Sequence, residues 1–279
     1  MKKNKLMSIS LICFMVLFLF MGCKNKDEII NLEDSKPAEQ IMMGSKDTQK
    51  ATEKSVIIVS ANWAPYEFEE NGEIKGISVD IVEEAFKRMG YKVTKKILPF
   101  SRAIELLKNG EIDMITDVKN TIKYQEIGIF SKEPIITTKT SLFVKSDSNI
   151  KFDGNILDLK SYKIGVIRDY TYGEAFDNAV KNKTIKVEEV DDKLQNINKL
   201  LDDRLDICIE NRLVLLDALK ATNNEGKLKE LKHEVNETPV YAWFSKKKNQ
   251  SKMVDEFDQK LAEIKRDGTF ERIYKSYID

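Results

Sequence analysis

The chain has 279 residues, of which 33% are charged and 42% hydrophobic. This composition is typical of a globular protein and is sufficient for one large domain or two modest ones. Basic and acidic residues number 46 each, so the balanced charge indicates no polyanionic partner and argues against nucleic-acid binding.

The N-terminus has the order of a secretory signal, because a basic "MKKNK" precedes the apolar "LMSISLICFMVLFLFMG". Cys23 then completes "FMGC", which is close to a lipobox, with Phe20 where leucine is usual. We therefore expect residues 1–22 to be a signal peptide and a lipidated Cys23 to anchor the protein to the membrane, outside the cytoplasm. The alternative is an uncleaved anchor, although the apolar run is short for a spanning helix, which needs about 20 residues.

Residues 23–53 contain the candidate anchor and a polar, charged segment without apolar periodicity, which predicts a disordered tether. The three cysteines do not offer a disulfide, since Cys13 lies in the signal and Cys23 is the candidate anchor. The remaining Cys208, in "LDICIEN", has the surroundings of a small buried hydrophobic residue.

Strand and helix patterns alternate from residue 54 onward. "SVIIVSA" predicts a strand, and "SVDIVEEAFKRMG" places four apolar residues on one helical stripe before a terminating glycine. "YKVTKKIL" is strand-like, and "SRAIELLKNG" predicts a short helix capped by Ser101. "EIDMITDV" predicts a third strand, which completes a β-α-β-α-β block.

A second block repeats this order. "YKIGVIRD", "TIKVEEV" and "RLDICIEN" predict strands, and "YGEAFDNAVKN", "DDKLQNINKLLDD" and "RLVLLDALKA" predict helices. The extended "KTSLFVKSD" and "PVYAWFSKK" lie where the chain should cross between the blocks. The C-terminal segment predicts two helices separated by Asp267-Gly268.

Two such blocks predict an α/β fold with two lobes, each built on a mostly parallel sheet. We expect residues 54–143 and 242–279 to form lobe 1 and residues 144–241 to form lobe 2. Ligands of open α/β sheets bind beyond the carboxyl ends of the strands. Trp63 and Tyr66 follow the first strand, so we expect their rings to line a cleft between the lobes.

Four segments in sequence resemble the extracytoplasmic solute-binding proteins of ABC importers, most closely the amino-acid-binding family with the type II periplasmic-binding fold. They are "NWAPYEFEENGEIKGISVDIVEEAFKRMGY", "LPFSRAIELLKNGEIDMIT", "YQEIGIFSKEPI" and "KLAEIKRDGTFERIYKSY". The resemblance covers residues 54–279. It implies a monomer without catalytic activity or cofactor that closes two lobes around a small solute and delivers it to ABC permease subunits.

The resemblance also implies ligand-binding positions. Trp63 and Phe100 fall on two opposing aromatic residues of the family, and Asp117 and Lys119 fall where backbone and hydroxyl groups hold the solute. In the second lobe, where the family often has Gly-Thr, this chain has "DYTYG" with Tyr170 and Thr171.

The family's two charged contacts to an amino acid are altered in this chain. An arginine that forks onto the α-carboxylate is replaced by Tyr124, and an aspartate that binds the α-ammonium is replaced by Asn211, preceded by Glu210. Each such contact contributes about 1.5–3 kcal/mol, so a standard α-amino acid should bind poorly unless other residues substitute. The candidate substitutes for carboxylate binding are Arg102, Lys119 and Arg168.

Each candidate also has a purely structural interpretation. Trp63 and Tyr66 could staple the end of the strand, Arg102 could pair with Glu105 on its helix, and Thr171 could cap the helix that follows it. Phe100 could belong to the core and Asp117 could cap a turn.

Other classes of function have weaker support. His233 is the only histidine and lies in a charged segment, so we expect it on the surface, and we expect no metal site. Some proteins of this fold are similar to dehydratases of cyclic organic acids, and an enzyme of that type would use Glu210 or Asp117 as acid or base. A ligand sensor acting in trans is a third possibility.

Overall fold

The computed structural model describes residues 54–278. The predictions for the signal peptide, Cys23 and the tether fall outside the described residues. Among residues 54–278, no helix has the length and apolar character that crossing a membrane requires.

The first block forms a parallel three-stranded sheet in the order β4-β1-β5. Its elements are β1 (Ser55–Ser60), α1 (Ile77–Arg88), β4 (Lys92–Ile97), α2 (Phe100–Asn109) and β5 (Met114–Val118). Successive side chains of a strand point to opposite faces of the sheet. Ile58 therefore packs with Phe86 of α1 on one face, whereas Val59 packs with Leu107 of α2 on the other.

The second block repeats this arrangement in the order β10-β8-β9, again with parallel pairing. Its elements are β8 (Ile164–Ile167), α4 (Glu174–Lys181), β9 (Val187–Val190), α5 (Lys193–Leu201), β10 (Ile207–Asn211) and α6 (Arg212–Ala221). Cys208 is a residue of β10 and lies in the core cluster that also contains residues of α5. Only 1% of its surface is exposed, which confirms that it is buried.

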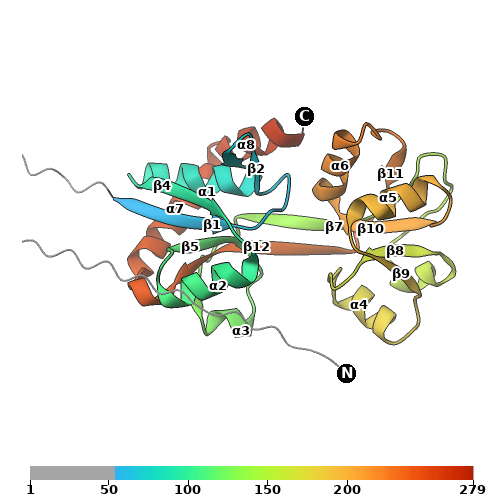
Figure 1. Cartoon of the computed structure of the whole chain (residues 1–279), viewed down its shortest axis with the longest axis horizontal. Coiled ribbons are helices and arrows are strands. Elements are labelled where there is room, and N and C mark those ends of the chain that lie inside the picture. The colour runs from blue at the N-terminus through green and yellow to red at the C-terminus, as the bar shows by residue number, and fades with distance from the viewer. Residues whose placement is uncertain (1–53, 279) are drawn as a thin grey trace, which may run out of the picture. The chain divides into compact units, whose positions relative to one another are not determined.

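Two long antiparallel strands join the sheets, namely β7 (Ile136–Lys145) and β12 (Asn236–Ser245). They pair with each other over Ile136–Thr140 and Asn236–Val240. Beyond this shared segment, β12 pairs with β5 of the first sheet and β7 pairs with β10 of the second. Each strand therefore runs from one lobe into the other, as Figure 1 shows, and the two-lobed α/β fold with two crossing segments is confirmed.

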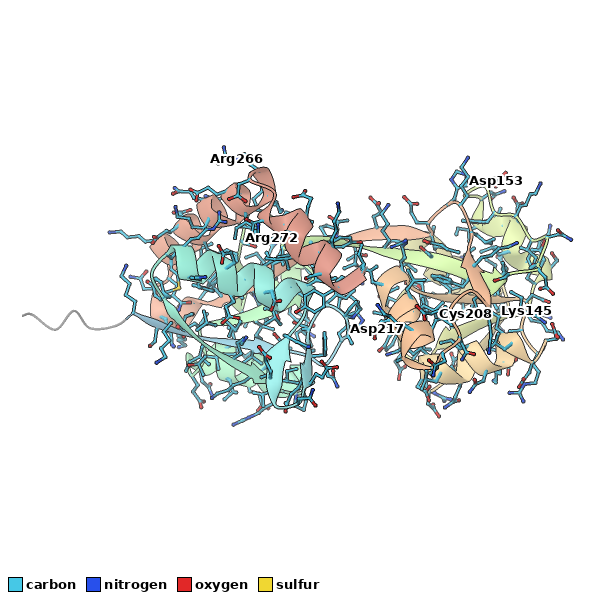
Figure 2. The ribbon with its side chains drawn as sticks, turned by 90° about the horizontal axis from the view of Figure 1, so that it is seen from above. Lys145, Asp153, Cys208, Asp217, Arg266 and Arg272 are labelled. Carbon is cyan, nitrogen blue, oxygen red and sulfur yellow. The ribbon has the colours of Figure 1, made fainter. Side chains whose placement is uncertain are left out.

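The C-terminal helices return to the first lobe, where Figure 2 shows them beside α1, with Arg266 and Arg272 labelled. They are α7 (Ser251–Arg266) and α8 (Thr269–Ile278). Phe257 of α7 packs on Phe86 of α1 with ring centroids 5.3 Å apart. The Tyr277 hydroxyl of α8 donates to Asp80 Oδ2 at 2.6 Å and accepts from the Gly76 N–H at 3.0 Å.

Several short elements were not predicted, because three to six residues are too few to show a period. They are β2 (Phe68–Glu70), β3 (Glu73–Lys75), α3 (Ile122–Gln125), β6 (Gly128–Phe130), β11 (Leu228–Glu230) and the 3-10 helices η1 (Ile156–Ser161) and η2 (Lys246–Lys248). β2 and β3 form a hairpin whose turn residues, Asn71 and Gly72, both have positive φ.

One expected helix cap is wrong, and one cap considered as an alternative is not formed. Helix α2 begins at Phe100 with Pro99 as its N-cap, two residues before the predicted cap Ser101. Helix α4 has Gly173 as its N-cap, so Thr171 does not cap it. Thr171 instead accepts a hydrogen bond from the Lys119 ammonium at 3.2 Å.

Candidate functional site

A cavity of about 460 Å³ lies beyond the carboxyl ends of β1, β5, β8 and β10, with residues of both lobes on its walls. The crossing strands contribute Thr138, Thr140 and Thr238, and the Thr138 hydroxyl donates to the Thr238 carbonyl oxygen at 3.2 Å. This edge of the sheets is the usual ligand position in open α/β folds.

The cavity brings together most of the site residues expected from the sequence. Lobe 1 contributes Trp63, Phe100, Asp117, Lys119 and Tyr124. Lobe 2 contributes Tyr170, Thr171 and Asn211. The hydrogen bond from Lys119 to Thr171 spans the two groups. Tyr66, Arg102, Arg168 and Glu210 do not line this cavity.

Tyr66 lies in the core beside the cavity, with 1% of its surface exposed. Its ring stacks on Trp63 with centroids 4.5 Å apart, and its hydroxyl donates to Asn211 Oδ1 at 3.1 Å. Burial raises the pKa of the Tyr66 phenol. Tyr66 therefore supports Trp63 from behind and links the first lobe to the start of α6.

The two arginines considered as carboxylate ligands point elsewhere. Arg102 is exposed on α2 and pairs with Glu105 one helical turn away at 2.9 Å, which is the structural alternative for this residue. Arg168 is also exposed and pairs with Asp191 at 3.3 Å. Neither guanidinium reaches the cavity, because both side chains are directed to solvent.

Glu210 is buried behind the cavity wall, with 3% of its surface exposed. Its Oε1 accepts a hydrogen bond from the Asn211 N–H at 2.7 Å. Burial raises the pKa of the Glu210 carboxyl to about 7, against the opposing effect of that hydrogen bond.

Two aromatic pairs form much of the cavity wall. Trp63 is backed by Tyr66, and Phe100 meets Tyr124 edge to face with centroids 6.0 Å apart and an interplanar angle of 85°. Tyr124 in turn packs on Trp243, whose indole N–H donates to the Tyr124 carbonyl oxygen at 3.1 Å. The ring of Tyr124 is thus fixed from the core side, at the position where the family arginine was expected.

Glu67 also lines the cavity, and the sequence analysis did not single it out. It is 2% exposed; its Oε1 accepts from the Ala61 N–H at 3.0 Å, and its other oxygen accepts from the Thr116 hydroxyl. The available signal was an acid directly after the aromatic-proline-aromatic motif, at the end of a buried strand.

Asp117 lies near the carboxyl end of β5 and adopts a positive φ of 53°. Within residues 54–278, neither of its buried carboxylate oxygens has a hydrogen-bond partner. Burial raises the pKa of Asp117, and the nearby Ser78 hydroxyl opposes the shift. Burial and the charge of Asp117 also raise the pKa of Glu67. Both carboxyls therefore keep their protons to a higher pH than free carboxyls do.

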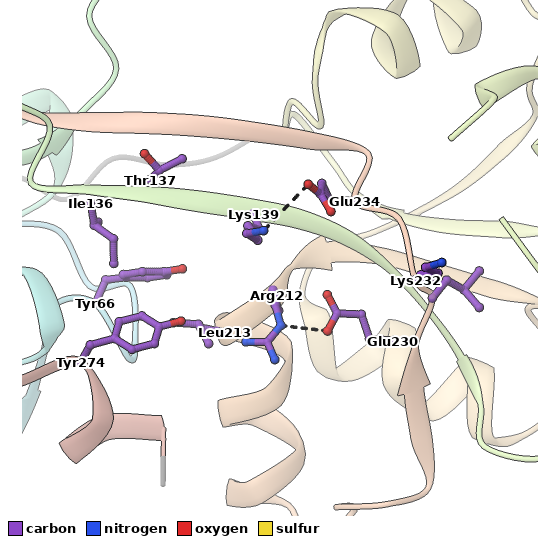
Figure 3. Close-up of a pocket in the computed structure, with 11 residues that line it drawn as sticks. Tyr66, Ile136, Thr137, Lys139, Arg212, Leu213, Glu230, Lys232, Glu234 and Tyr274 are labelled. Atoms are coloured by element: carbon purple, nitrogen blue, oxygen red, sulfur yellow. Dashed lines mark hydrogen bonds and ion pairs between the residues drawn. The ribbon is translucent and has the colours of Figure 1, made fainter. Parts of the chain in front are cut away.

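A second cavity of about 400 Å³ lies beside the crossing strands and includes Tyr66 and Tyr274 (Figure 3). Four of its five charged side chains pair with one another, since Arg212 pairs with Glu230 at 2.8 Å and Lys139 pairs with Glu234 at 3.8 Å, while Lys232 is the fifth. The first cavity instead contains a carboxylate that lacks a partner, and we therefore take the first as the candidate ligand site.

Within the described part of the chain, no cluster of three or more histidine, cysteine or acidic side chains has the arrangement of a metal site. His233 is exposed, as expected. The polar and aromatic groups of the candidate cavity are aromatic rings, hydroxyl groups, the Asn62 and Asn211 amides, two carboxyls and one lysine.

Comparison with known proteins places this geometry in context. The model of the bacterial extracellular solute-binding proteins, family 3, matches residues 56–279. The protein named "Probable amino-acid-binding protein YxeM" from Bacillus subtilis (strain 168) is 24% identical over 221 residues, which covers 77% of this chain and 80% of that protein. The L-cystine-binding protein TcyA of the same organism is 23% identical over 219 residues, or 76% of each chain.

A solved structure shares the arrangement of the whole described region. An ancestral arginine-binding protein bound to arginine has a TM-score of 0.60 and 25% sequence identity, and the match covers 81% of this chain and 98% of that one. Each of these three proteins is named for binding an amino acid.

Proposed function

The chain belongs to the bacterial extracellular solute-binding proteins, family 3, and we infer its function from this membership. We propose that it captures a small polar solute, an amino acid or a related compound, between its lobes and presents it to the permease subunits of an ABC importer. The observation that carries this proposal is the cavity at the strand ends, whose walls come from both lobes.

The mechanism is closure about the crossing strands. A solute that touches only one lobe gains nothing from closure, whereas a solute that touches Trp63 and Tyr170 favours the arrangement in which both are close. The solute thus shifts the population toward the closed state by its difference in affinity for the two states. No bond of the solute is made or broken.

The identity of the solute depends on the two altered contacts. Tyr124 provides no charge for an α-carboxylate. Asn211 is also occupied, because its Oδ1 accepts from the Leu213 and Val214 N–H groups as the N-cap of α6 and from the Tyr66 hydroxyl. A compound related to an amino acid, without the full α-amino-acid contacts, therefore suits this cavity.

The location follows from the family and from the N-terminal sequence. We propose that the signal peptide is removed and that Cys23 is lipidated, so that the monomeric protein stays at the outer face of the membrane. Mass spectrometry of the mature N-terminus tests this, and a Cys23→Ala variant should be released into the medium. An unmodified N-terminus that retains residues 1–22 contradicts lipidation.

One observation favours an enzyme as a second candidate, namely the raised pKa of the Asp117 and Glu67 carboxyls at a cavity. Against it, Glu67 is held by two hydrogen bonds, so its carboxyl is not free to transfer a proton. Long incubation of the mature protein with prephenate-like cyclic acids distinguishes the two, and an unchanged acid supports a binding protein.

A thermal-shift screen of the mature protein tests the binding function. Amino acids, amines, organic acids and sugars are added singly. A ligand at 100 times its Kd stabilises the folded state by about 2.7 kcal/mol, which corresponds to a rise in Tm of about 5–10 °C for a domain of this size. If no compound of any class raises Tm, the proposal fails.

A further inference from the structure

The charged side chains on the wall of the candidate cavity have an uneven distribution. Glu67 and Asp117 contribute two carboxyls from lobe 1, and Lys119 contributes an amine that already donates to Thr171. No arginine lines the cavity in the part of the chain that the structure describes. The charged groups on the wall therefore suit a solute with a positive charge better than a solute with a negative charge.

Asp117 is the group in this set that lacks a partner. Both of its carboxylate oxygens are buried without a hydrogen bond from residues 54–278, and the nearby Ser78 hydroxyl is also unpartnered, although Asp117 lines the cavity. A buried carboxylate without donors or a nearby cation is energetically costly, and proteins rarely leave one unmatched. A solute with an ammonium group supplies both the missing donors and the missing charge.

Glu67 strengthens the attraction of a cation to Asp117 without itself serving as the main hydrogen-bond acceptor for the solute. Its two oxygens are occupied by the Ala61 N–H and the Thr116 hydroxyl, so its acceptor capacity is partly used. When ionised, Glu67 adds negative potential beside Asp117, and this potential is strong because both groups are removed from water.

The aromatic residues of the cavity complement the same charge. Trp63, Phe100, Tyr124 and Tyr170 present rings from both lobes. A cation within about 6 Å of a ring centroid is attracted by the negative face of the ring, more strongly when water is excluded. An anionic solute would meet the opposite effect at the same surfaces.

We propose that the solute is an organic ammonium compound whose positive charge is held at Asp117 among these rings, and that an α-carboxylate is not required for binding. This inference rests on the proposed solute-binding function and specifies its ligand class. It accounts for the loss of the arginine at Tyr124, because a solute without a carboxylate needs no such partner.

Matched probes test the inference on the mature protein. Agmatine is compared with arginine, cadaverine with lysine, and tyramine with tyrosine and with 3-(4-hydroxyphenyl)propanoate, by thermal shift and calorimetry. We expect at least one amine to bind more tightly than the amino acid and the acid of the same skeleton. If an amino acid, acid or sugar is the tightest ligand, the inference is overturned while the binding function stands. If no probe and no compound of the wider screen binds, both are overturned.

A matched pair of variants locates the ammonium. Asp117→Asn keeps the shape of the side chain and should weaken the best amine about tenfold or more, the usual effect of losing a charged hydrogen bond. Asp258→Asn is the control, because Asp258 is a buried carboxylate of α7 with one unpartnered oxygen and lies outside the cavity. An Asp117→Asn protein that binds the amine as tightly as the wild type overturns the proposal.

Discussion

At the scale of single residues, the site depends on one tight turn after β1. The Trp63 N–H donates to the Glu67 carbonyl at 2.6 Å, and the Glu67 N–H donates to the Trp63 carbonyl at 3.1 Å. Trp63 and Glu67 thus both reach the cavity, while Tyr66 enters the core and supports the indole. The aromatic-proline-aromatic motif past the end of the buried strand thus contributes one ring to the cavity wall and one ring to the core.

The first prediction compares two side chains on lobe 1. Trp63→Ala removes a wall of the cavity and should weaken the solute identified in the screen by about tenfold or more, since aromatic contacts with a ligand cation contribute up to about 2 kcal/mol. Arg102→Ala removes only an exposed ion pair, whose contribution is about 0–1 kcal/mol. Calorimetry should therefore show an unchanged Kd for Arg102→Ala. Equal losses in both variants contradict the assignment of the cavity.

The second prediction concerns the pH dependence of the ligand-free protein. The pKa of Asp117 is raised in the folded state above its ordinary value of about 3.9. The folded state then binds more protons than the unfolded state, so stability falls as pH rises through this interval. Glu67 and Glu210 act in the same direction, whereas the raised pKa of Tyr66 keeps its phenol protonated through this interval.

Asp117→Asn isolates the contribution of that group. Between pH 5 and pH 8, denaturant unfolding should show a decrease in stability that is smaller in the variant, by about 1–2 kcal/mol, than in the wild type. Identical slopes in the two proteins would mean that Asp117 is ionised normally in the folded state.

At the scale of elements, each lobe is a strand-helix repeat whose carboxyl ends present short loops to the cavity. The β10–α6 junction is the most constrained of these, since Asn211 ends the strand, caps the helix and binds the Tyr66 hydroxyl. The polar side chain therefore has a structural role in addition to its place on the cavity wall.

The third prediction tests this junction. Asn211→Ala removes the cap of α6, which costs about 1 kcal/mol, and should lower Tm by about 2–4 °C. Asn211→Asp keeps the acceptor oxygen and should melt close to the wild type. Scanning calorimetry of the ligand-free variants compares them, and an Asn211→Ala protein as stable as Asn211→Asp argues against the cap.

The elements that could be predicted from the sequence are those with a pattern in their own residues. The helices carry an apolar stripe, and the strands of the two blocks and the crossing strands are apolar or alternating runs, of which β8 and β10 are buried along their whole length. β6 and β11 could not be predicted, because each is three residues long and exists through pairing with β12 or β7.

The site was partly predictable for the same reason. Residues at the strand ends, such as Trp63, Asp117 and Asn211, follow from topology and line the cavity. Arg102 and Arg168 do not line the cavity. Their position could not be predicted, because the sequence does not show whether a cationic side chain on a helix or loop points to the cavity or to solvent. Glu67 was missed because its role depends on the turn that folds it back toward Thr116.

At the scale of the whole described region, the two lobes share β7 and β12, and contacts such as the Tyr66–Asn211 hydrogen bond cross between them. In the proposed function, a solute in the cavity adds further contacts to both lobes, and this addition is the driving force for closure. Binding and closure are thus one event, and the closed form is what the permease recognises in the proposed function.

The chain offers a direct reporter of this event, because it contains two tryptophans, Trp63 at the cavity and Trp243 fully buried in the first lobe. We expect the solute to change tryptophan emission in the wild type with the Kd found by calorimetry. In Trp63→Phe, which keeps a ring for the solute, the solute should still bind by calorimetry but the emission should not change. An undiminished change in Trp63→Phe would show that the solute binds away from this cavity.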